Sequence, residues 1–269
     1  MATPRRKVAV VTGAGGGIGA AVCAELAQAG MTIFGIDRSA TALDGLLSRL
    51  GASGLSSHCV CGDLTSEEFL EDARKTLLKA YGPADVLVNA AGYLAPAASI
   101  DRFDMREWDR SFAINLRSVL IAIRSFGGDM KESHCGSIVN VASSAATLPN
   151  ASAPYGCSKA ALVSLTRQIA MEWGPFGVRC NAVSPGFLVT QLSSHLYQNP
   201  EIYQQRSEAV ALRRIGSVDD VARVVAFLAG DGASYISGQD IAVDGGLSVT
   251  SLMRLQPEGS AYRQGDTWP

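Results

Sequence analysis

Short apolar runs alternate with segments of helical periodicity along most of the chain. The runs are strand-length and continuous, which is typical of strands buried on both faces of a parallel sheet. They begin near residues 8, 32, 58, 86, 137, 179 and 240. Between them, apolar residues recur three and four positions apart, as in helices that cover a sheet. The pattern predicts one α/β domain with a doubly wound parallel sheet of about seven strands and helices on both faces.

Two helical segments carry signals that go beyond periodicity. Thr65 and Glu68 have the spacing of a capping box, which predicts a helix start at Thr65. Residues 104–126 read as one long helix, although the asparagine in its middle, Asn115, is locally unfavourable there. Such an exception points to a functional role for Asn115, or else to a core amide or a surface residue.

The pattern also divides the chain. We expect residues 1–250 to form the domain, and the segment 187–212, of mixed polarity and weak periodicity, to be a lid over a ligand site. A peripheral helical hairpin is the alternative for that segment. Residues 251–269 follow the last predicted strand as an extension that packs on a neighbouring subunit or forms a disordered terminus.

The first predicted strand opens into a glycine-rich loop that leads into the first predicted helix. Glycine lets the backbone take positive φ angles and lets an anion approach, while the N–H groups of the first helical turn face that anion. The spacing is T-G-x-x-x-G-x-G, because Ile18 stands where the commoner G-x-G-x-x-G pattern needs glycine. The loop predicts a Rossmann-type site for a dinucleotide pyrophosphate, although by itself it also fits an ordinary strand-to-helix turn.

Composition excludes several other classes of function. A formal net charge of -2 over 269 residues leaves no basic surface for nucleic acid or an anionic membrane. No apolar stretch is long enough to cross a bilayer. The six cysteines lack C-x-x-C spacing, which favours free thiols in a reducing cytoplasm. His58, Cys59 and Cys61 fall on a predicted buried strand, so we expect core packing there and no metal site.

The sharpest chemical signal is the pair Tyr155 and Lys159, four residues apart on one predicted helix face. A phenol has a pKa near 10, too high for a base at neutral pH unless a neighbour favours the phenolate. We therefore expect the Lys159 ammonium to lower the pKa of Tyr155, giving a proton donor and acceptor. In isolation, a surface tyrosine beside a surface lysine is the more ordinary explanation.

The pair does not stand alone, because the chain resembles the short-chain dehydrogenase/reductase family in the order and spacing of its motifs. These are the glycine loop, Asp37, Asp63, Asn89-Ala-Ala-Gly92, Asn115, Ser143 and the Tyr155/Lys159 pair. The resemblance implies an oxidoreductase that passes a hydride between a nicotinamide cofactor and a secondary alcohol or ketone.

The resemblance also implies a role for each reacting residue. Tyr155 would be the general acid/base, and Ser143 would hydrogen-bond the substrate oxygen. Lys159 would hold the nicotinamide ribose, and Asn115 would support a proton relay through water. Ser144 is an alternative to Ser143, because the interval to Tyr155 is one residue shorter than is usual in the family.

Cofactor contacts are implied for the glycine loop, the ends of the predicted strands and the P-G-x-x-x-T element. Together with Tyr155 and Lys159 these residues are Gly13, Gly17, Ile18, Gly19, Asp37, Arg38, Asp63, Leu64, Asn89, Ala90, Gly92, Pro185, Gly186 and Thr190. Ala90 departs from the family's N-N-A-G motif, which puts the polar contact of the second asparagine in doubt.

Asp37 and Arg38 decide which cofactor we expect. A carboxylate within ~4 Å of a 2′-phosphate is repelled by ~4 kcal/mol at an effective dielectric constant of 20, so Asp37 favours NAD over NADP. Arg38 could offset this by pairing with the phosphate. An NADPH-dependent carbonyl or 3-oxoacyl reductase is therefore the alternative function, and a catalytically silent dinucleotide-binding sensor or scaffold is the alternative from another class.

The substrate pocket and the assembly are the least specified parts. Candidate substrate contacts are Tyr93, Leu94, Ser143, Asn150, Phe187 and His195. Most are apolar or aromatic, which suggests a medium-sized alcohol or ketone. Residues 104–126 and 155–173 are apolar over more than one stripe, which predicts a partner subunit, and the resembled family commonly forms tetramers. We expect a cytoplasmic homotetramer with no nucleic-acid or membrane partner.

Overall fold

The computed structural model describes residues 5–52, 54, 57–190 and 193–250. They form one sheet of seven parallel strands in the order β3-β2-β1-β4-β5-β6-β7, which confirms the predicted fold class. The strands are β1 Val8–Thr12, β2 Thr32–Asp37, β3 Ser57–Cys61, β4 Val86–Asn89, β5 Gly136–Val141, β6 Val178–Pro185 and β7 Asp240–Val243.

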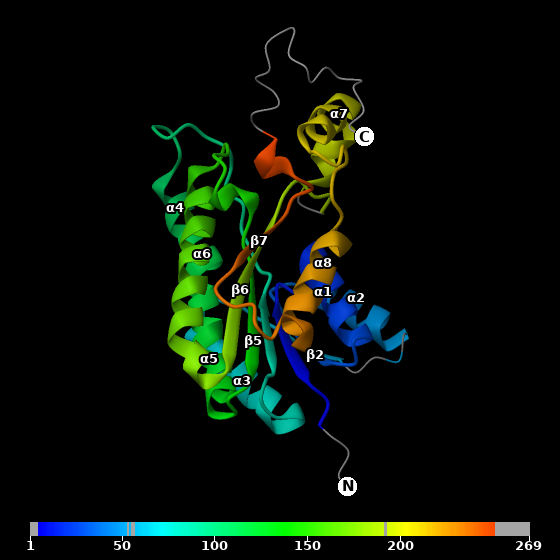
Figure 1. Ribbon diagram of the computed structural model, residues 1–269, viewed down its shortest axis with the longest axis vertical. Coiled ribbons are helices and arrows are strands. Elements are labelled where there is room, and N and C mark those ends of the chain that lie inside the picture. Colours follow the sequence, from blue (N-terminus) through cyan, green and yellow to red (C-terminus); the bar gives the residue numbers. More distant parts are fainter. Residues whose placement is uncertain (1–4, 53, 55–56, 191–192, 251–269) are drawn as a thin grey trace.

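Helices cover both faces of the sheet (Figure 1). The helices are α1 Gly17–Gln28, α2 Ala40–Ala52, α3 Glu67–Tyr81, α4 Met105–Phe112, α5 Ser118–Glu132, α6 Ala153–Trp173, α7 Pro200–Ala209 and α8 Val218–Ala229. Helices α1, α2 and α8 lie on one face and α3, α5 and α6 on the other. The strand order reverses between β1 and β4, and ligands of such sheets bind beyond the carboxyl ends of the strands at this point.

Two apolar cores explain why the strands are continuous apolar runs. In β1, Ala9 and Val11 pack into the core under α1, α2 and α8, whereas Val8 and Val10 pack into the core under α3, α5 and α6. All four side chains are buried, because successive strand residues point to opposite faces. A strand covered on both sides therefore has no polar face.

Helices α5 and α6 are in close contact on the second face. A Cβ atom at Gly127 of α5 would overlap the ring of Trp173 at the end of α6. No side chain larger than hydrogen fits there, so the backbone of α5 rests directly on the indole. This contact fixes how far α5 and α6 can approach or slide.

Two expectations are wrong in detail, one about where a helix starts and one about whether a helix is continuous. Helix α3 is capped by Ser66, whose hydroxyl accepts from the Phe69 N–H at 3.2 Å, and not by Thr65. The Thr65 hydroxyl instead donates to Asp63 at 2.9 Å. The predicted helix 104–126 is interrupted by a π-helical turn at Ala113–Arg117 and then continues as α5 to Glu132.

The expected lid consists of a short 3-10 turn at Ser194–Gln198 and helix α7, which lie beyond the carboxyl ends of the strands (Figure 1). Its role as a lid stays a prediction, and its residues 191–192 lie outside the described part. The whole expected extension 251–269 also lies outside it. Within the described residues, no helix combines the length and the apolar character needed to cross a bilayer.

Candidate active site

The register of the central strands brings the predicted motifs to one edge of the sheet. Asn89 of β4 lies opposite Asn140 of β5, and Val141 of β5 lies opposite Val183 of β6. The segments that follow these three strands therefore leave the same edge of the sheet, staggered by a few residues, on strands about 4.8 Å apart. They contain the N-A-A-G turn, the predicted reacting serine and the P-G-x-x-x-T element.

The glycine loop is shaped by contacts that exclude side chains. Gly13 has φ +68°, a conformation that favours glycine, and a Cβ atom there would lie 2.6 Å from the Ala91 backbone nitrogen. A Cβ atom at Gly19 would overlap the Gly13 carbonyl oxygen. These glycines let the loop pack against the N-A-A-G turn.

The helix that follows presents an open amino terminus. Gly16 precedes α1 and makes no side-chain capping bond to the first N–H groups of the helix, which include those of Gly17 and Ile18. A Cβ atom at Gly17 would lie 3.7 Å from the Thr190 Cβ atom, so the loop faces the P-G-x-x-x-T element. Positive helix-end charge, open N–H groups and space at glycine fit a pyrophosphate.

Carboxylates line the end expected for adenosine. Both Asp37 oxygens accept backbone hydrogen bonds at 3.0 Å, one from Gly15 in the loop and one from Ser39. Asp63 accepts from the backbone and hydroxyl of Thr65, and these bonds hold the pKa of Asp63 below its usual range. Asp37 thus ties β2 to the glycine loop, at the position where the motif predicts the ribose ligand.

Arg38 and Leu64 flank these carboxylates. The Arg38 carbonyl accepts a hydrogen bond from Cys61, which pairs with Asp37 across β2 and β3. The charge of Arg38 helps to lower the pKa of Asp63, so the two side chains are electrostatic neighbours. Leu64 is partly buried against the core under α3 and α5.

Asn115 is buried in the π-helical turn and all of its side-chain bonds are made. Its oxygen accepts from the Tyr93 N–H at 2.7 Å. Its amide nitrogen donates to the Tyr93 carbonyl and the Ser158 hydroxyl, each at 2.9 Å. One amide thereby joins the segment after β4 to helix α6, and π-helical turns are frequent at functional sites.

The Tyr93 side chain contacts two residues of helix α4. Its hydroxyl donates to Glu107 at 2.5 Å, and the Arg110 guanidinium lies 4.2 Å from its ring centroid. Sequence reasoning missed Glu107 and Arg110, because a glutamate in the first turn and an arginine in the last turn of a helix are ordinary. Tyr93 as a substrate contact stays a prediction.

Tyr155 lies near the start of α6, and the Ser143 hydroxyl is close enough to its phenol to affect the pKa of Tyr155. Burial raises the pKa of Tyr155, and the Ser143 hydroxyl opposes that rise. The sequence predicts that Lys159 lowers this pKa, but the balance here is set by burial and Ser143. Ser143 rather than Ser144 meets the phenol, while Ser144 starts a short 3-10 turn.

Lys159 is fully enclosed beside Tyr155. Its Nζ atom lies 5.9 Å from the Tyr155 ring centroid and donates to the Val141 carbonyl at 2.7 Å. Burial lowers the pKa of Lys159 to about 8. A Cβ atom at Gly92 would lie 3.6 Å from Nζ and 3.7 Å from the Asn115 side-chain oxygen, so the N-A-A-G turn meets both residues.

The N-A-A-G turn is anchored from β4. The Asn89 amide nitrogen donates to Asn140 at 2.8 Å, and its side-chain oxygen is buried with no partner among the described residues. Ala90, which replaces the family's second asparagine, donates its N–H to the Thr12 carbonyl and packs partly against the core. The alanine fills this place by packing.

The P-G-x-x-x-T element continues from β6. Pro185 is the last residue of β6 and pairs with Val243, and a Cβ atom at Gly186 would lie 2.7 Å from the Asp244 Cβ atom. The Thr190 N–H donates to the Ser193 hydroxyl at 3.0 Å, which closes a tight turn. The element is thereby held at the edge where the cofactor residues gather.

The remaining predicted substrate contacts are placed unequally. Leu94 is 54% exposed, and the exposed Asn150 uses its side-chain oxygen to accept the Ser152 N–H at 2.7 Å. Phe187 is partly buried directly after the P-G pair. The side chain of His195 lies outside the described part. Within the described residues, no group of three or more His, Cys, Asp or Glu side chains could hold a metal ion.

Comparison with known proteins decides the family. A family model described as enoyl-(acyl carrier protein) reductase matches residues 13–248. A galactitol 2-dehydrogenase (L-tagatose-forming) from Cereibacter sphaeroides is 35% identical over 244 residues, which are 90% of this chain and 94% of that protein. The chain belongs to the short-chain dehydrogenase/reductase family. The predicted resemblance is confirmed, and this dehydrogenase/reductase is an oxidoreductase by family.

Other members of the family differ in activity. A 3-oxoacyl-[acyl-carrier-protein] reductase from Staphylococcus epidermidis is 32% identical and covers 90% of this chain and 98% of its own. The crystal structure of an actinorhodin polyketide ketoreductase variant with NADPH has a TM-score of 0.88 and 30% identity, covering 93% and 100% of the two chains. The family fold thus binds nicotinamide dinucleotides, and the similar solved structures include complexes with NADPH or NADP.

Replacing Lys159 by methionine should increase stability most at neutral pH. Because burial lowers its pKa from 10.5 to about 8, the folded state disfavours the ammonium, and wild-type stability should rise as pH increases from about 8 to 10.5. We expect Lys159→Met to gain on the order of 3 kcal/mol in unfolding free energy at pH 7, offset partly by the lost Val141 bond, and progressively less by pH 10.

Denaturant titrations at pH 7, 8.5 and 10 measure this difference. Lys79→Met, at an exposed lysine of α3, is the matched control and should show no such pH dependence. A stability difference for Lys159→Met that is constant across this range would contradict the lowered pKa.

Proposed function

We propose that this dehydrogenase/reductase transfers a hydride between NAD(H) and a secondary alcohol or ketone, with Tyr155 as the general acid/base. The observation that carries the proposal is the Tyr155 phenol beside the buried Lys159 ammonium, with the Ser143 hydroxyl next to the phenol. A phenol and a hydroxyl that share a site beyond the carboxyl ends of the strands can both bond to one substrate oxygen.

The raised pKa of Tyr155 favours the protonated phenol at neutral pH, so this side chain is ready to give a proton to a carbonyl oxygen. In the reverse direction it must accept the proton of an alcohol, and a charged Lys159 nearby makes that easier. Ser143 donates to the substrate oxygen and orients it. The bound nicotinamide supplies or accepts the hydride.

Asn115 serves this mechanism by position. Its amide fixes the Tyr93 backbone and the Ser158 hydroxyl, and thus the spacing between the N-A-A-G turn and α6. The family resemblance also implies that Asn115 supports a relay of protons through water behind Lys159, and this relay is part of the proposal.

NAD is the proposed cofactor because Asp37 stands at the end of β2 with its carboxylate against the glycine loop. A 2′-phosphate placed there would meet that negative charge. Arg38 favours the competing proposal of an NADPH-dependent carbonyl or 3-oxoacyl reductase, which the similar 3-oxoacyl reductase and the NADPH-bound ketoreductase also support. A cytoplasmic location is supported by six free cysteines in the described part, and cell fractionation would check it.

Titration with NADH and, separately, NADPH tests the cofactor proposal. At one fixed salt concentration, nicotinamide fluorescence should show NADH binding at least tenfold more tightly, because the Asp37 carboxylate repels the 2′-phosphate. In Asp37→Ser the preference should shrink or reverse, whereas Arg38→Ala should weaken NADPH binding further. Tighter NADPH binding by the wild-type chain would move the reductase proposal to first place.

Substitution of Tyr155 tests the catalytic role. Tyr155→Phe removes only the hydroxyl, so turnover of ketones or secondary alcohols should fall at least a thousandfold, while the NADH dissociation constant stays within about threefold. Tyr235→Phe, which removes the phenolic hydroxyl of an exposed tyrosine with no role in the site, is the matched control and should keep the turnover. Unchanged turnover in Tyr155→Phe would favour the silent sensor or scaffold instead.

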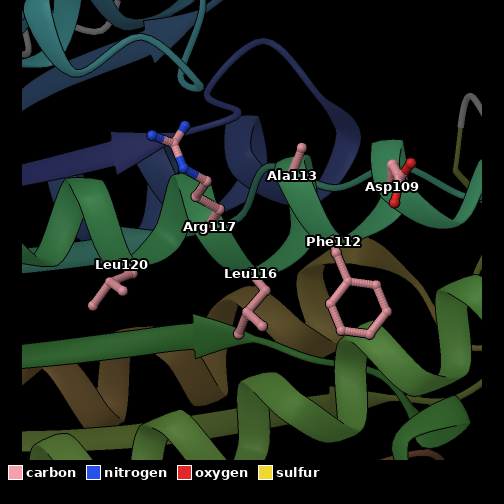
Figure 2. Close-up of a pocket in the computed structure, with 6 residues that line it drawn as sticks. All are labelled: Asp109, Phe112, Ala113, Leu116, Arg117 and Leu120. Carbon is pink, nitrogen blue, oxygen red and sulfur yellow. The ribbon is translucent and has the colours of Figure 1, made fainter. Parts of the chain in front are cut away.

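We further propose that the chain assembles as a homotetramer through the outer face of the α4–α5 run. An open, largely apolar groove lies there, lined by Asp109, Phe112, Ala113, Leu116, Arg117 and Leu120. Figure 2 shows these side chains along one helical run, with Leu120 at one end and Asp109 at the other. Leu120 is 38% exposed, so part of this apolar patch is open to solvent, as is common at protein–protein contact sites.

Leu120→Asp should weaken that assembly without unfolding the chain. A charge in a buried subunit contact is strongly unfavourable, whereas an exposed aspartate on a monomer is tolerated. Sedimentation velocity should show a tetramer for the wild type and a dimer or monomer for the variant. Lys79→Asp on α3 is the control, and an unchanged mass for Leu120→Asp would exclude this groove as an interface.

A further inference from the structure

Arg206 of α7 is held between two aromatic rings. Its guanidinium carbon lies 5.0 Å from the Phe187 ring centroid and 5.4 Å from the Tyr197 ring centroid. Both distances are within the range of cation–π contacts. The rings come from different segments, one directly after β6 and the other from the 3-10 turn before α7, so they fix the position of the charge.

The charge of Arg206 is not neutralised within the described part of the chain. Its one hydrogen bond there runs from Nη1 to the Tyr197 hydroxyl at 3.2 Å, and no carboxylate lies within ion-pair distance. The nearby Glu208 accepts from Gln204, and Arg214 pairs with Asp220. Arg206 is also partly buried, a setting in which a charge without a counter-ion is unfavourable.

Phe187 links this charge to the reacting edge. Val183 lies opposite Val141 in the β5–β6 register, so Phe187, four residues after Val183, extends past the same edge as Ser143. The Phe187 carbonyl accepts from Gly216 at 2.9 Å, which anchors its backbone. Arg206 therefore contacts the aromatic ring that follows β6 at the same edge of the sheet at which Ser143 follows β5.

The N–H groups of Arg206 that bond to no described residue indicate which kind of ligand it can bind. Two rings lie against the guanidinium and the Tyr197 hydroxyl accepts from Nη1, whereas Nε and Nη2 make no hydrogen bond to a described residue and can form two parallel hydrogen bonds. That fork matches a carboxylate. A phosphate would carry a second charge, and the neighbouring Arg214 already has a partner.

We propose that Arg206 binds a carboxylate of the substrate, which makes the substrate a hydroxy or oxo acid with its reacting carbon distant from the acid group. This inference rests on the proposed function, because it places the ligand in the same site. Phe187 and Tyr197 then act as positioning residues that hold the guanidinium edge toward the site.

Binding measurements test this inference without requiring turnover. Isothermal titration calorimetry of the protein saturated with its preferred reduced dinucleotide would use aldonates of four to six carbons and alditols of the same length. At least one aldonate should bind at least tenfold more tightly than its neutral partner. Arg206→Gln should remove that preference, and Arg206→Lys should keep only part of it, since an ammonium lacks the fork.

Each outcome decides the inference. An equal loss of aldonate and alditol binding in Arg206→Gln would show that Arg206 only holds α7 in place, and would overturn it. Absence of any aldonate preference in the wild type would also overturn it, as would tighter, Arg206-dependent binding of glucitol 6-phosphate. Oxidation of neutral alcohols lost in Tyr155→Phe, combined with no aldonate preference, would leave the proposed function standing and remove this inference alone.

Discussion

The site depends on the buried amide of Asn115. A buried amide without partners costs a few kcal/mol, so its surroundings have to supply two acceptors and a donor. The Tyr93 backbone supplies one of each and Ser158 the other acceptor. These bonds can form only if the turn after β4, the α4–α5 run and α6 approach one another. The π-helical turn, in which the Ser118 N–H bonds to the Ala113 carbonyl, places the amide where it meets both partners.

The reacting pair shows stability given up for function. A buried lysine whose pKa falls to about 8 destabilises the folded state, and an apolar side chain of the same length at that position would make it more stable. Its one direct compensation in the described residues is the Val141 carbonyl. The adjacent phenol shows the opposite effect of the same enclosure, because burial favours its neutral form. One dry environment thus pushes the two pKa values apart, because the pKa of Lys159 falls to about 8 while the pKa of Tyr155 rises above its usual value.

Much of the fold could be predicted from the sequence, because the five inner strands are buried along almost their whole length and each connection contains a helix. The glycine loop and the Tyr155/Lys159 pair could also be identified from the sequence, because backbone crowding and helical periodicity depend on neighbouring residues. The helix start at Ser66 could not be predicted, because Thr65 and Ser66 are both good capping residues. The π-helical turn could not be predicted either, because it depends on the contacts of Asn115 with residues distant in the sequence. The pKa of Tyr155 depends on enclosure by several segments, which no spacing reveals. Arg206 was missed because its partners are aromatic rings, which leave no charge pattern in the sequence.

The contact between Gly127 and Trp173 joins α5 to the far end of the helix that carries Tyr155 and Lys159. The apolar groove around Leu116 and Leu120 lies on the α4–α5 run. Position 127 therefore requires glycine, because any side chain there would displace the indole and change the distance between α5 and α6. A single glycine thus sets how the helix of the reacting residues packs against the helix whose surface we propose as a subunit contact.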